Sequence, residues 1–263
     1  IAGHVMDGNN NNTMSGYRWD ATTGMVNIAD KDGNGTVDGS ASEWATDYTN
    51  VSAMNSDGSV LVGLTRIGSV FRAFRWDATT GMVNIADKDG NGTVDGSASE
   101  WGTGFGVASA ISSDGSIIAG YANDGSKNRA FRWDATDGMV NIAGDWATGN
   151  SMARAISSDG SVIAGSANDG TAERVFRWDA DGMVNITGDW ATGNSRAEVM
   201  STDGSVIGGY ANDGTTHRAF RWDATNGMVN IAGDWATGNS GARAISSDGS
   251  IITGYANDGN TAR

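Results

Sequence analysis

The sequence of 263 residues contains no cysteine and no proline, and only two histidines and four glutamates. The absence of cysteine excludes disulfide scaffolds and thiol chemistry. No run approaches the roughly 18 apolar residues of a membrane helix. No charged start followed by an apolar stretch indicates a signal peptide. We therefore expect no membrane insertion in this segment.

Positive charge is also scarce. The chain has 17 Lys and Arg residues against 31 Asp and Glu residues, which gives a formal net charge of -14. Such a charge repels the phosphate backbone of nucleic acids and anionic lipid headgroups. Nucleic acid is therefore not an expected partner.

The most abundant feature is an internal repeat that covers the whole chain. Arg-Trp-Asp is followed each time by Gly-Met-Val-Asn, a second tryptophan, an Ala-Ile-Ser-Ser-Asp-Gly-like segment and a Val-Ile-Ala-Gly-like segment. The first tryptophan of each copy is Trp19, Trp76, Trp133, Trp178 or Trp222. These positions differ by 57, 57, 45 and 44 residues, and insertions of 12 residues account for the two longer spacings. The basic repeat is thus about 45 residues long.

Each repeat has the pattern of short antiparallel strands. Phe131 and Trp133 alternate with Arg132 and Asp134, which is the periodicity of a β-strand. Asp-Gly pairs separate successive apolar runs and predict hairpin turns, because Gly and Asp tolerate positive φ. One set of glycines comprises Gly115, Gly160, Gly204 and Gly249, and the other comprises Gly125, Gly170, Gly214 and Gly259. Four strands per repeat follow.

Four strands in about 45 residues predict an all-β fold, a β-propeller built from about five four-stranded repeats. An open array of small sheets and other all-β forms are the alternatives. We expect a single repeat domain over residues 1–263, with residues 1–16 as the last strand of a preceding repeat. The repeats are expected to begin near Tyr17, Phe74, Phe131, Phe176 and Phe220.

The two ends of the chain carry the same type of strand, at Ile1–His4 and at Ile251–Tyr255. One strand is therefore surplus at one end. Either the chain is a piece of a longer array, or the surplus strand completes a blade in this molecule or in a neighbour. Pairing with a neighbour would produce homo-oligomers or filaments.

The order Phe-Arg-Trp, Gly-Met-Val, Ala-Ile-Ser-Ser-Asp-Gly and Val-Ile-Ala-Gly resembles the bacterial extracellular HAF repeats of surface proteins and autotransporter passengers. The nearest approach to the eponymous His-Ala-Phe is His217-Arg218-Ala219-Phe220, which carries an additional arginine. The usual Asp-Leu-Gly after Gly-Met-Val is here Asn-Ile-Ala or Asn-Ile-Thr. The resemblance implies an extracellular or cell-surface location and gives no catalytic residues.

The two insertions resemble calcium-binding loops. Oxygen ligands at positions 1, 3, 5 and 9, a glycine at 6 and a carbonyl at 7 are the features with which EF-hand-type loops bind Ca²⁺. The expected ligands are Asp30, Asp32, Asn34, Thr36 and Asp38 in the first loop, and Asp87, Asp89, Asn91, Thr93 and Asp95 in the second. Position 12, normally glutamate, is Ala41 or Ala98. The sequence therefore predicts Ca²⁺ as a structural cofactor of modest affinity, with a solvated Asp/Gly loop as the alternative.

The tryptophans have two interpretations. The first set lies on strands beside phenylalanine and is expected to pack between blades. The second set lies in turns of the type Gly-Asp-Trp-Ala-Thr-Gly and comprises Trp44, Trp101, Trp146, Trp190 and Trp235. Trp146, Trp190 and Trp235 are candidates for stacking on sugars at the rim. The alternative is that these rings fill the gap to the next blade.

Residues suited to catalysis are few. The histidines His4 and His217 occupy different repeat positions, and no nucleophile elbow, zinc spacing or phosphate loop is present. We therefore predict a non-enzymatic extracellular or cell-surface protein for structure or adhesion, stabilised by calcium, whose partner is a second copy or a surface glycan or protein. A glycan-binding β-propeller is the alternative, and a hydrolase is the third hypothesis.

Overall fold

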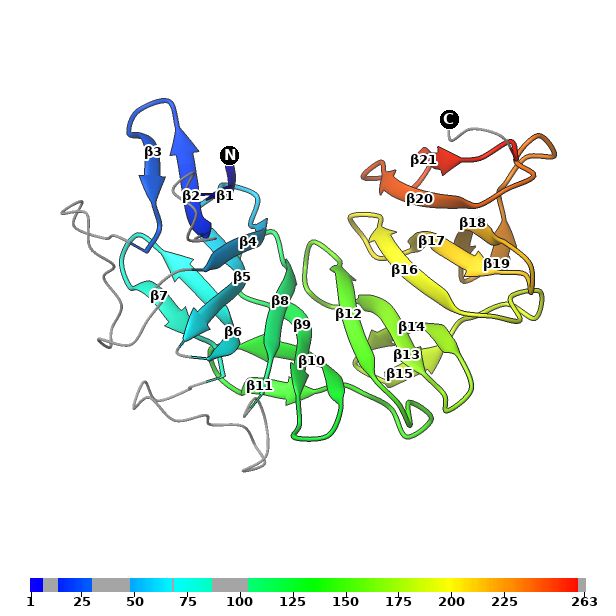
Figure 1. Ribbon diagram of the computed structural model, residues 1–263, viewed down its shortest axis with the longest axis horizontal. Helices are drawn as coiled ribbons and strands as arrows, with labels where there is room; N and C mark the ends of the chain where they lie inside the picture. Colours follow the sequence, from blue (N-terminus) through cyan, green and yellow to red (C-terminus); the bar gives the residue numbers. More distant parts are fainter. Residues whose placement is uncertain (7–13, 30–47, 68, 87–103, 260–263) are drawn as a thin grey trace. The chain divides into compact units, whose positions relative to one another are not determined.

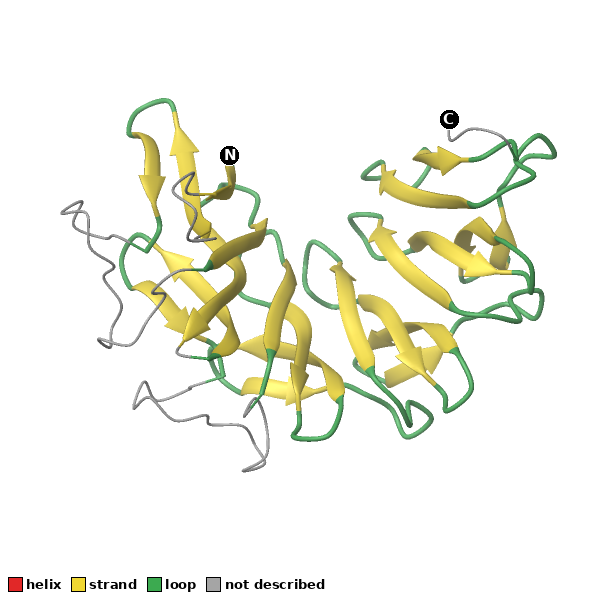
Figure 2. Ribbon diagram, in the orientation of Figure 1, coloured by secondary structure: helices red, strands yellow, loops and turns green. Residues whose placement is uncertain are grey.

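The computed structural model describes residues 1–6, 14–29, 48–67, 69–86 and 104–259, and the regular structure there consists of β-strands (Figure 1, Figure 2). Within these ranges no helix is long and apolar enough to cross a membrane. In chain order the strands are β1 (Ala2–Met6), β2 (Met14–Asp20), β3 (Gly24–Asn27), β4 (Thr49–Met54), β5 (Val60–Ile67), β6 (Val70–Asp77), β7 (Gly81–Asn84), β8 (Gly106–Ile111), β9 (Ile118–Asn123), β10 (Asn128–Asp134), β11 (Gly138–Asn141), β12 (Ser151–Ile156), β13 (Ile163–Asn168), β14 (Glu173–Asp179), β15 (Gly182–Asn185), β16 (Ser195–Met200), β17 (Val206–Asn212), β18 (His217–Asp223), β19 (Gly227–Asn230), β20 (Ser240–Ile245) and β21 (Ile252–Ala256).

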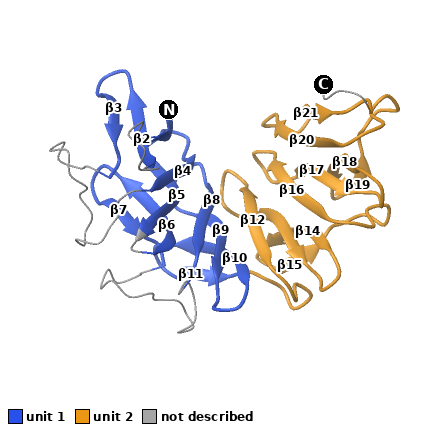
Figure 3. Cartoon of the chain, in the orientation of Figure 1, with its two compact units in different colours: residues 1–141 blue, residues 142–263 orange. Residues whose placement is uncertain are grey.

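The chain forms two compact units, residues 1–141 and residues 142–263 (Figure 3). Unit 1 contains a three-stranded sheet, β1-β2-β3, and the four-stranded sheets β4-β5-β6-β7 and β8-β9-β10-β11. Unit 2 contains the four-stranded sheets β12-β13-β14-β15 and β16-β17-β18-β19, and a two-stranded sheet, β20-β21. All pairings within these sheets are antiparallel between strands that follow one another in the chain.

The sheets confirm four strands per repeat but shift the expected repeat boundaries. The expected starts, such as Phe131 and Phe176, fall on the third strand of a sheet, whereas the sheets themselves begin at the Ala-Ile-Ser-like strand. A sequence repeat has no intrinsic starting point, so the pairing of the strands decides where each sheet begins. Residues 2–6 form β1, which pairs with β2 in the sheet that contains Tyr17.

Every described Ala-Ile-Ser-like strand contains a β-bulge. In β8 the register shifts between Ala108 and Ala110, and β4, β12, β16 and β20 shift at the equivalent position. The bulge turns the carbonyl of Val107 toward β9, where a Cβ atom on Gly120 would lie 2.0 Å from the Val107 oxygen. The ring of Phe131 lies over the same glycine, 2.9 Å from that Cβ position. Only glycine fits at this place in the sheet.

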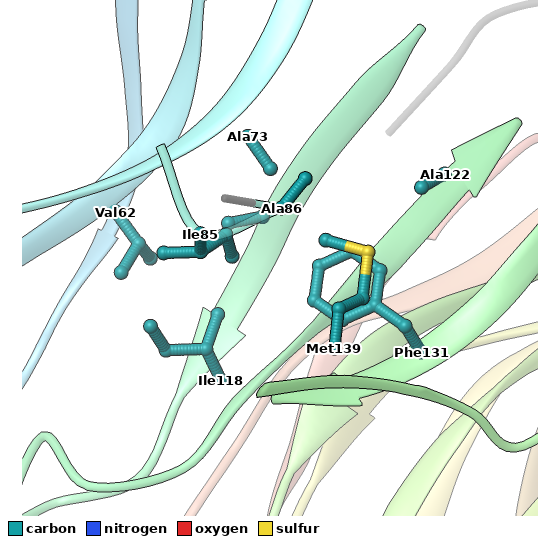
Figure 4. Packing of buried hydrophobic residues seen from close by; sticks show 9 residues of the cluster. Val62, Ala73, Ile85, Ala86, Ile118, Ala122, Phe131 and Met139 are labelled. Carbon is teal, nitrogen blue, oxygen red and sulfur yellow. The ribbon is translucent and has the colours of Figure 1, made fainter. Parts of the chain in front are cut away.

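The cores lie between successive sheets. Figure 4 shows one of them in unit 1, where Val62 and Ile85 meet Ile118, Phe131 and Met139 of the following sheet. The first strand of a sheet makes this contact, since β8 packs against β4, β5 and β6 in unit 1, and β16 packs against β12, β13 and β14 in unit 2. Phe131 is fully buried, as are its repeat equivalents Phe74, Phe176 and Phe220.

The predicted hairpin turns are confirmed. Gly160 and Gly204 have φ values of 74° and 72°, and the other predicted turn glycines are likewise positive. The turns of successive sheets are also joined through backbone atoms in unit 2. The Ser158 N–H donates to the Thr202 carbonyl over 2.8 Å, and the Thr202 N–H donates to the Ser247 carbonyl over 2.9 Å. Each turn therefore closes its own hairpin and contacts the next.

Candidate functional site

The predicted calcium ligands lie outside the residues that the structure describes. These are Asp30, Asp32, Asn34, Thr36, Asp38, Asp87, Asp89, Asn91, Thr93 and Asp95. Among the described residues, no three histidine or acidic side chains come together in a group suited to a metal ion. The calcium loops therefore stay a prediction from the sequence.

The aspartates of the hairpin turns are engaged in local hydrogen bonds. Asp159 accepts from the Ser157 hydroxyl over 2.6 Å, and from the N–H and hydroxyl of Ser161 over 3.0 and 2.7 Å. The Ser157 hydroxyl bond, followed by the two bonds from Ser161, lowers the pKa of Asp159 to about 2. The equivalents Asp114, Asp203 and Asp248 also have a pKa of about 2, for the same cause. These carboxylates act as turn-forming groups.

Acid is therefore expected to destabilise the protein between about pH 4 and pH 2. The native pKa of these aspartates lies near 2 and the ordinary value is 3.8, so the unfolded chain binds more protons in this interval. Their stabilisation is fully present above pH 4 and is lost as the pH falls through 2. Thermal unfolding followed by circular dichroism from pH 6 to pH 2 measures this loss.

The matched control is the double variant Asp159→Asn/Asp203→Asn. Asparagine retains one carbonyl acceptor for each turn but does not titrate. Its melting temperature should fall less steeply with acid than that of the native chain. An equally steep fall in both proteins would contradict the assignment to these turns.

The arginines of Arg-Trp-Asp pair with the aspartate two residues later. Arg18 and Asp20 lie 2.6 Å apart, and the same contact occurs in four later repeats. Asp77 also accepts the backbone N–H groups of Thr79 and Thr80, both over 2.8 Å, and so closes the turn before β7. The side chains are partly exposed, so each ion pair contributes about 0 to 1 kcal/mol. The pairs are structural.

The second set of tryptophans contacts the neighbouring sheet. The Nε1–H of Trp146 donates to the Met183 carbonyl over 3.3 Å, and that of Trp190 donates to the Met228 carbonyl over 3.1 Å. Both rings are half-buried. This geometry agrees with the gap-filling interpretation at these two positions. Trp44 and Trp101 lie outside the described residues.

Trp235 differs from its two equivalents. It follows β19, at the same repeat position, but is 57% exposed. It borders an apolar hollow of about 240 Å³ over β20 and β21, lined also by Ile231, Ala242, Gly254 and Tyr255. In the described part of the chain, the sheet that follows Trp235 consists of β20 and β21. The exposed indole is therefore the largest aromatic group at this end of unit 2.

The candidate acid–base residues lie apart in the repeat. His4 is exposed on β1, and His217 on β18 lies with its ring centroid 4.8 Å from that of Tyr210. Glu173 faces Arg196 at 3.3 Å, and Glu198 faces Arg243 at 3.7 Å. Both contacts join successive sheets of unit 2. No sequence motif indicates these two ion pairs, because the partners lie more than 20 positions apart.

No family model matches the chain, and no curated protein matches it. Several solved structures have a similar fold. TolB from Acinetobacter baumannii has a TM-score of 0.56 at 13% identity over 99% of this chain and 59% of its own. The chain thus spans 59% of the length of that structure. Oligogalacturonate lyase from Vibrio parahaemolyticus has a TM-score of 0.50 at 12% identity, over 99% of this chain and 67% of its own.

The chain has the β-propeller fold. Prolyl oligopeptidase B from Galerina marginata is also similar, with a TM-score of 0.50 at 9% identity over 78% of this chain and 29% of its own. The fold class predicted from the repeat is thus confirmed. Because TolB and two proteins named as enzymes share the likeness at such low identities, it shows the fold alone.

Proposed function

We propose that the protein is a non-enzymatic structural or adhesion repeat protein of the bacterial cell exterior, stabilised by Ca²⁺ and able to self-assemble. One observation carries the proposal. The polar side chains that recur in the described repeats, such as Asp159, Arg177 and Trp190, each hold a turn or a contact between sheets. A catalytic site would instead place its polar groups where a substrate reaches them.

The location rests on the sequence. The order of motifs resembles extracellular HAF repeats, and the chain is acidic and free of cysteine. The fold agrees with a scaffold, since propeller sheets bury a core by stacking on their neighbours. A hydrolase is the competing hypothesis, and one protein with a similar fold is named as a prolyl oligopeptidase.

A lectin with several equivalent tryptophan sites has less support. Trp146 and Trp190 are half-buried and donate to the adjacent sheet, so their rings do not form an equivalent open set with Trp235. Of these three candidates, Trp235 alone is exposed enough to stack on a sugar. The proposed structural role requires no glycan.

Calcium is expected to stabilise the chain and to promote assembly. Loops of extracellular type bind Ca²⁺ with Kd values of about 0.1 to 1 mM, so about 2 mM Ca²⁺ stabilises each loop by about 0.6 to 1.8 kcal/mol. Size-exclusion chromatography with light scattering, together with thermal unfolding, tests this in calcium and in chelator. We expect a higher melting temperature and larger assemblies in calcium.

The matched control is the variant Asp32→Asn/Asp89→Asn, which removes one carboxylate from each loop. Its melting temperature and mass should respond less to calcium. A monomer of 27.1 kDa in both buffers would overturn the assembly proposal. An unchanged melting temperature in both buffers would overturn the calcium proposal.

A further inference from the structure

Apolar side chains are exposed beside the C-terminal sheet of unit 2, β20-β21. Ile231 and Trp235 are exposed there, at 41% and 57%. Ile28 has the repeat position of Ile231 in unit 1 and is 1% exposed, because Phe74 and Met82 of the following sheet cover it. Those covering residues lie on the third and fourth strands, β6 and β7. Within the described ranges, the C-terminal sheet consists of β20 and β21 and lacks such a pair.

The preceding sheet shows what fits this face. On β17, Gly209 lies under the ring of Phe220, and the carbonyl of Met228 on β19 accepts the Trp190 N–H over 3.1 Å. The covering element is therefore a hairpin with an aromatic residue opposite the glycine and a methionine whose carbonyl faces the tryptophan. In the C-terminal sheet, Gly254 is the equivalent of Gly209, and Trp235 is the equivalent of Trp190. One partner of each contact is therefore present.

The register of β21 matches that of β17. Gly254 pairs with Ala242 across a β-bulge, as Gly209 pairs with Ala197. The second edge of β17 pairs with β18, while the second edge of β21 has no partner strand among the residues that the structure describes. An added strand of the β18 type would meet both the open edge of β21 and the hollow beside Trp235.

A hairpin of this type lies at the other end of the sequence. On β2, Tyr17 lies opposite Gly3 of β1, as Phe220 lies opposite Gly209. On β3, Met25 is 60% exposed, whereas its equivalent Met228 is buried. The strand β1 that pairs with this hairpin has only five residues, and none of them is buried. Its replacement therefore costs little buried surface.

Building on the proposed self-assembly, we infer that β21 of one copy replaces β1 beside the β2–β3 hairpin of a second copy. The resulting sheet has the order β20-β21-β2-β3, which is the order of the four-stranded sheets within the chain. Tyr17 of the second copy lies over Gly254, and its Met25 carbonyl accepts the Trp235 N–H. The partner is therefore a second copy of this chain, recognised by strand addition.

A pair of introduced cysteines tests the register. By analogy with the pairing of Ala211 with Arg218, Ala256 would face Ser15 of the second copy. Facing residues in antiparallel strands have Cα atoms about 4.5 to 5.5 Å apart, which a disulfide can span. The chain has no cysteine of its own, so any disulfide in Ser15→Cys/Ala256→Cys joins introduced cysteines, and peptide mapping identifies the 15–256 pair.

We expect disulfide-linked dimers or larger species on a non-reducing gel. The control Ser15→Cys/Asn257→Cys should link poorly, because a shift of one residue turns the side chain to the other face. A disulfide within one chain, which leaves the mass at 27.1 kDa, would overturn the inference. Equal linking by the control would overturn it too.

A second measurement separates this contact from self-assembly in general. Trp235→Phe keeps an aromatic ring but removes the N–H donor, so it should weaken association about five- to tenfold in light-scattering titrations. Trp190→Phe makes the same change inside the chain and should leave association unchanged. Assembly unaffected by Trp235→Phe, without cysteine linking, would contradict the strand exchange but leave the proposed function intact. Cysteine-linked dimers without calcium-dependent assembly would support the strand exchange but contradict the proposed calcium-dependent function.

Discussion

Replacement of Gly120 by alanine is expected to lower the free energy of unfolding by about 3 kcal/mol or more. The new Cβ atom would lie 2.0 Å from the Val107 carbonyl oxygen and 2.9 Å from the Phe131 ring. Neither neighbour moves easily, because the oxygen belongs to a bulged strand and the ring is fully buried. Denaturant unfolding followed by tryptophan fluorescence measures the loss.

The matched control for this prediction is Gly106→Ala in the adjacent strand β8. Its Cβ atom would come no closer than 3.4 Å to a neighbouring atom, which is an ordinary contact. The stability of this variant should lie within about 1 kcal/mol of the native value. If Gly120→Ala were as stable as Gly106→Ala, the close approach at the bulge would not exist in solution.

Truncation of Phe176 to alanine is expected to cost about 3 to 5 kcal/mol. The ring is fully buried in unit 2 and lies against Gly165, so its removal leaves a cavity that the neighbouring backbone fills poorly. The loss should be greatest in the β12-β13-β14-β15 sheet, because a repeat contacts mainly its neighbours. Amide hydrogen exchange, read sheet by sheet, measures both the size and the location of this effect.

Phe105→Ala is the control for Phe176→Ala, since Phe105 is 36% exposed and its truncation leaves little cavity. It should cost about 1 kcal/mol. Loss of protection spread evenly over all sheets would contradict the assignment of Phe176 to a local core.

The fold class was predictable because the sequence pattern that indicates it is local. Strand alternation around Phe131 and Trp133, and the glycines at Gly160 and Gly204, specify strands and turns within a few residues. The starting point of each sheet was not predictable in this way. It depends on which edge of a strand such as β1 forms hydrogen bonds, and both edges are consistent with the same alternation.

The candidate site was predictable only in part. The pairing of Arg18 with Asp20 follows from a spacing of two along a strand, which places both on one face. The partner of Trp146 is Met183, in the next sheet and 37 positions away, so no short motif indicates it. The recurrence of methionine in every Gly-Met-Val-Asn was the available signal. The β-bulges were not predictable, because the alternation of apolar and polar residues does not indicate them.

The contacts between sheets have a consequence for how such a protein changes its length. Within each unit, the first strand of a sheet packs on the sheet before it. In unit 2 the contact also recurs at one position, where a tryptophan N–H donates to a methionine carbonyl of the following sheet. A duplicated stretch of gene therefore encodes both halves of every new contact. Residues 18–44 and 75–101 are identical. Duplication of a whole repeat therefore adds a sheet that fits its neighbours, and no compensating substitution is needed.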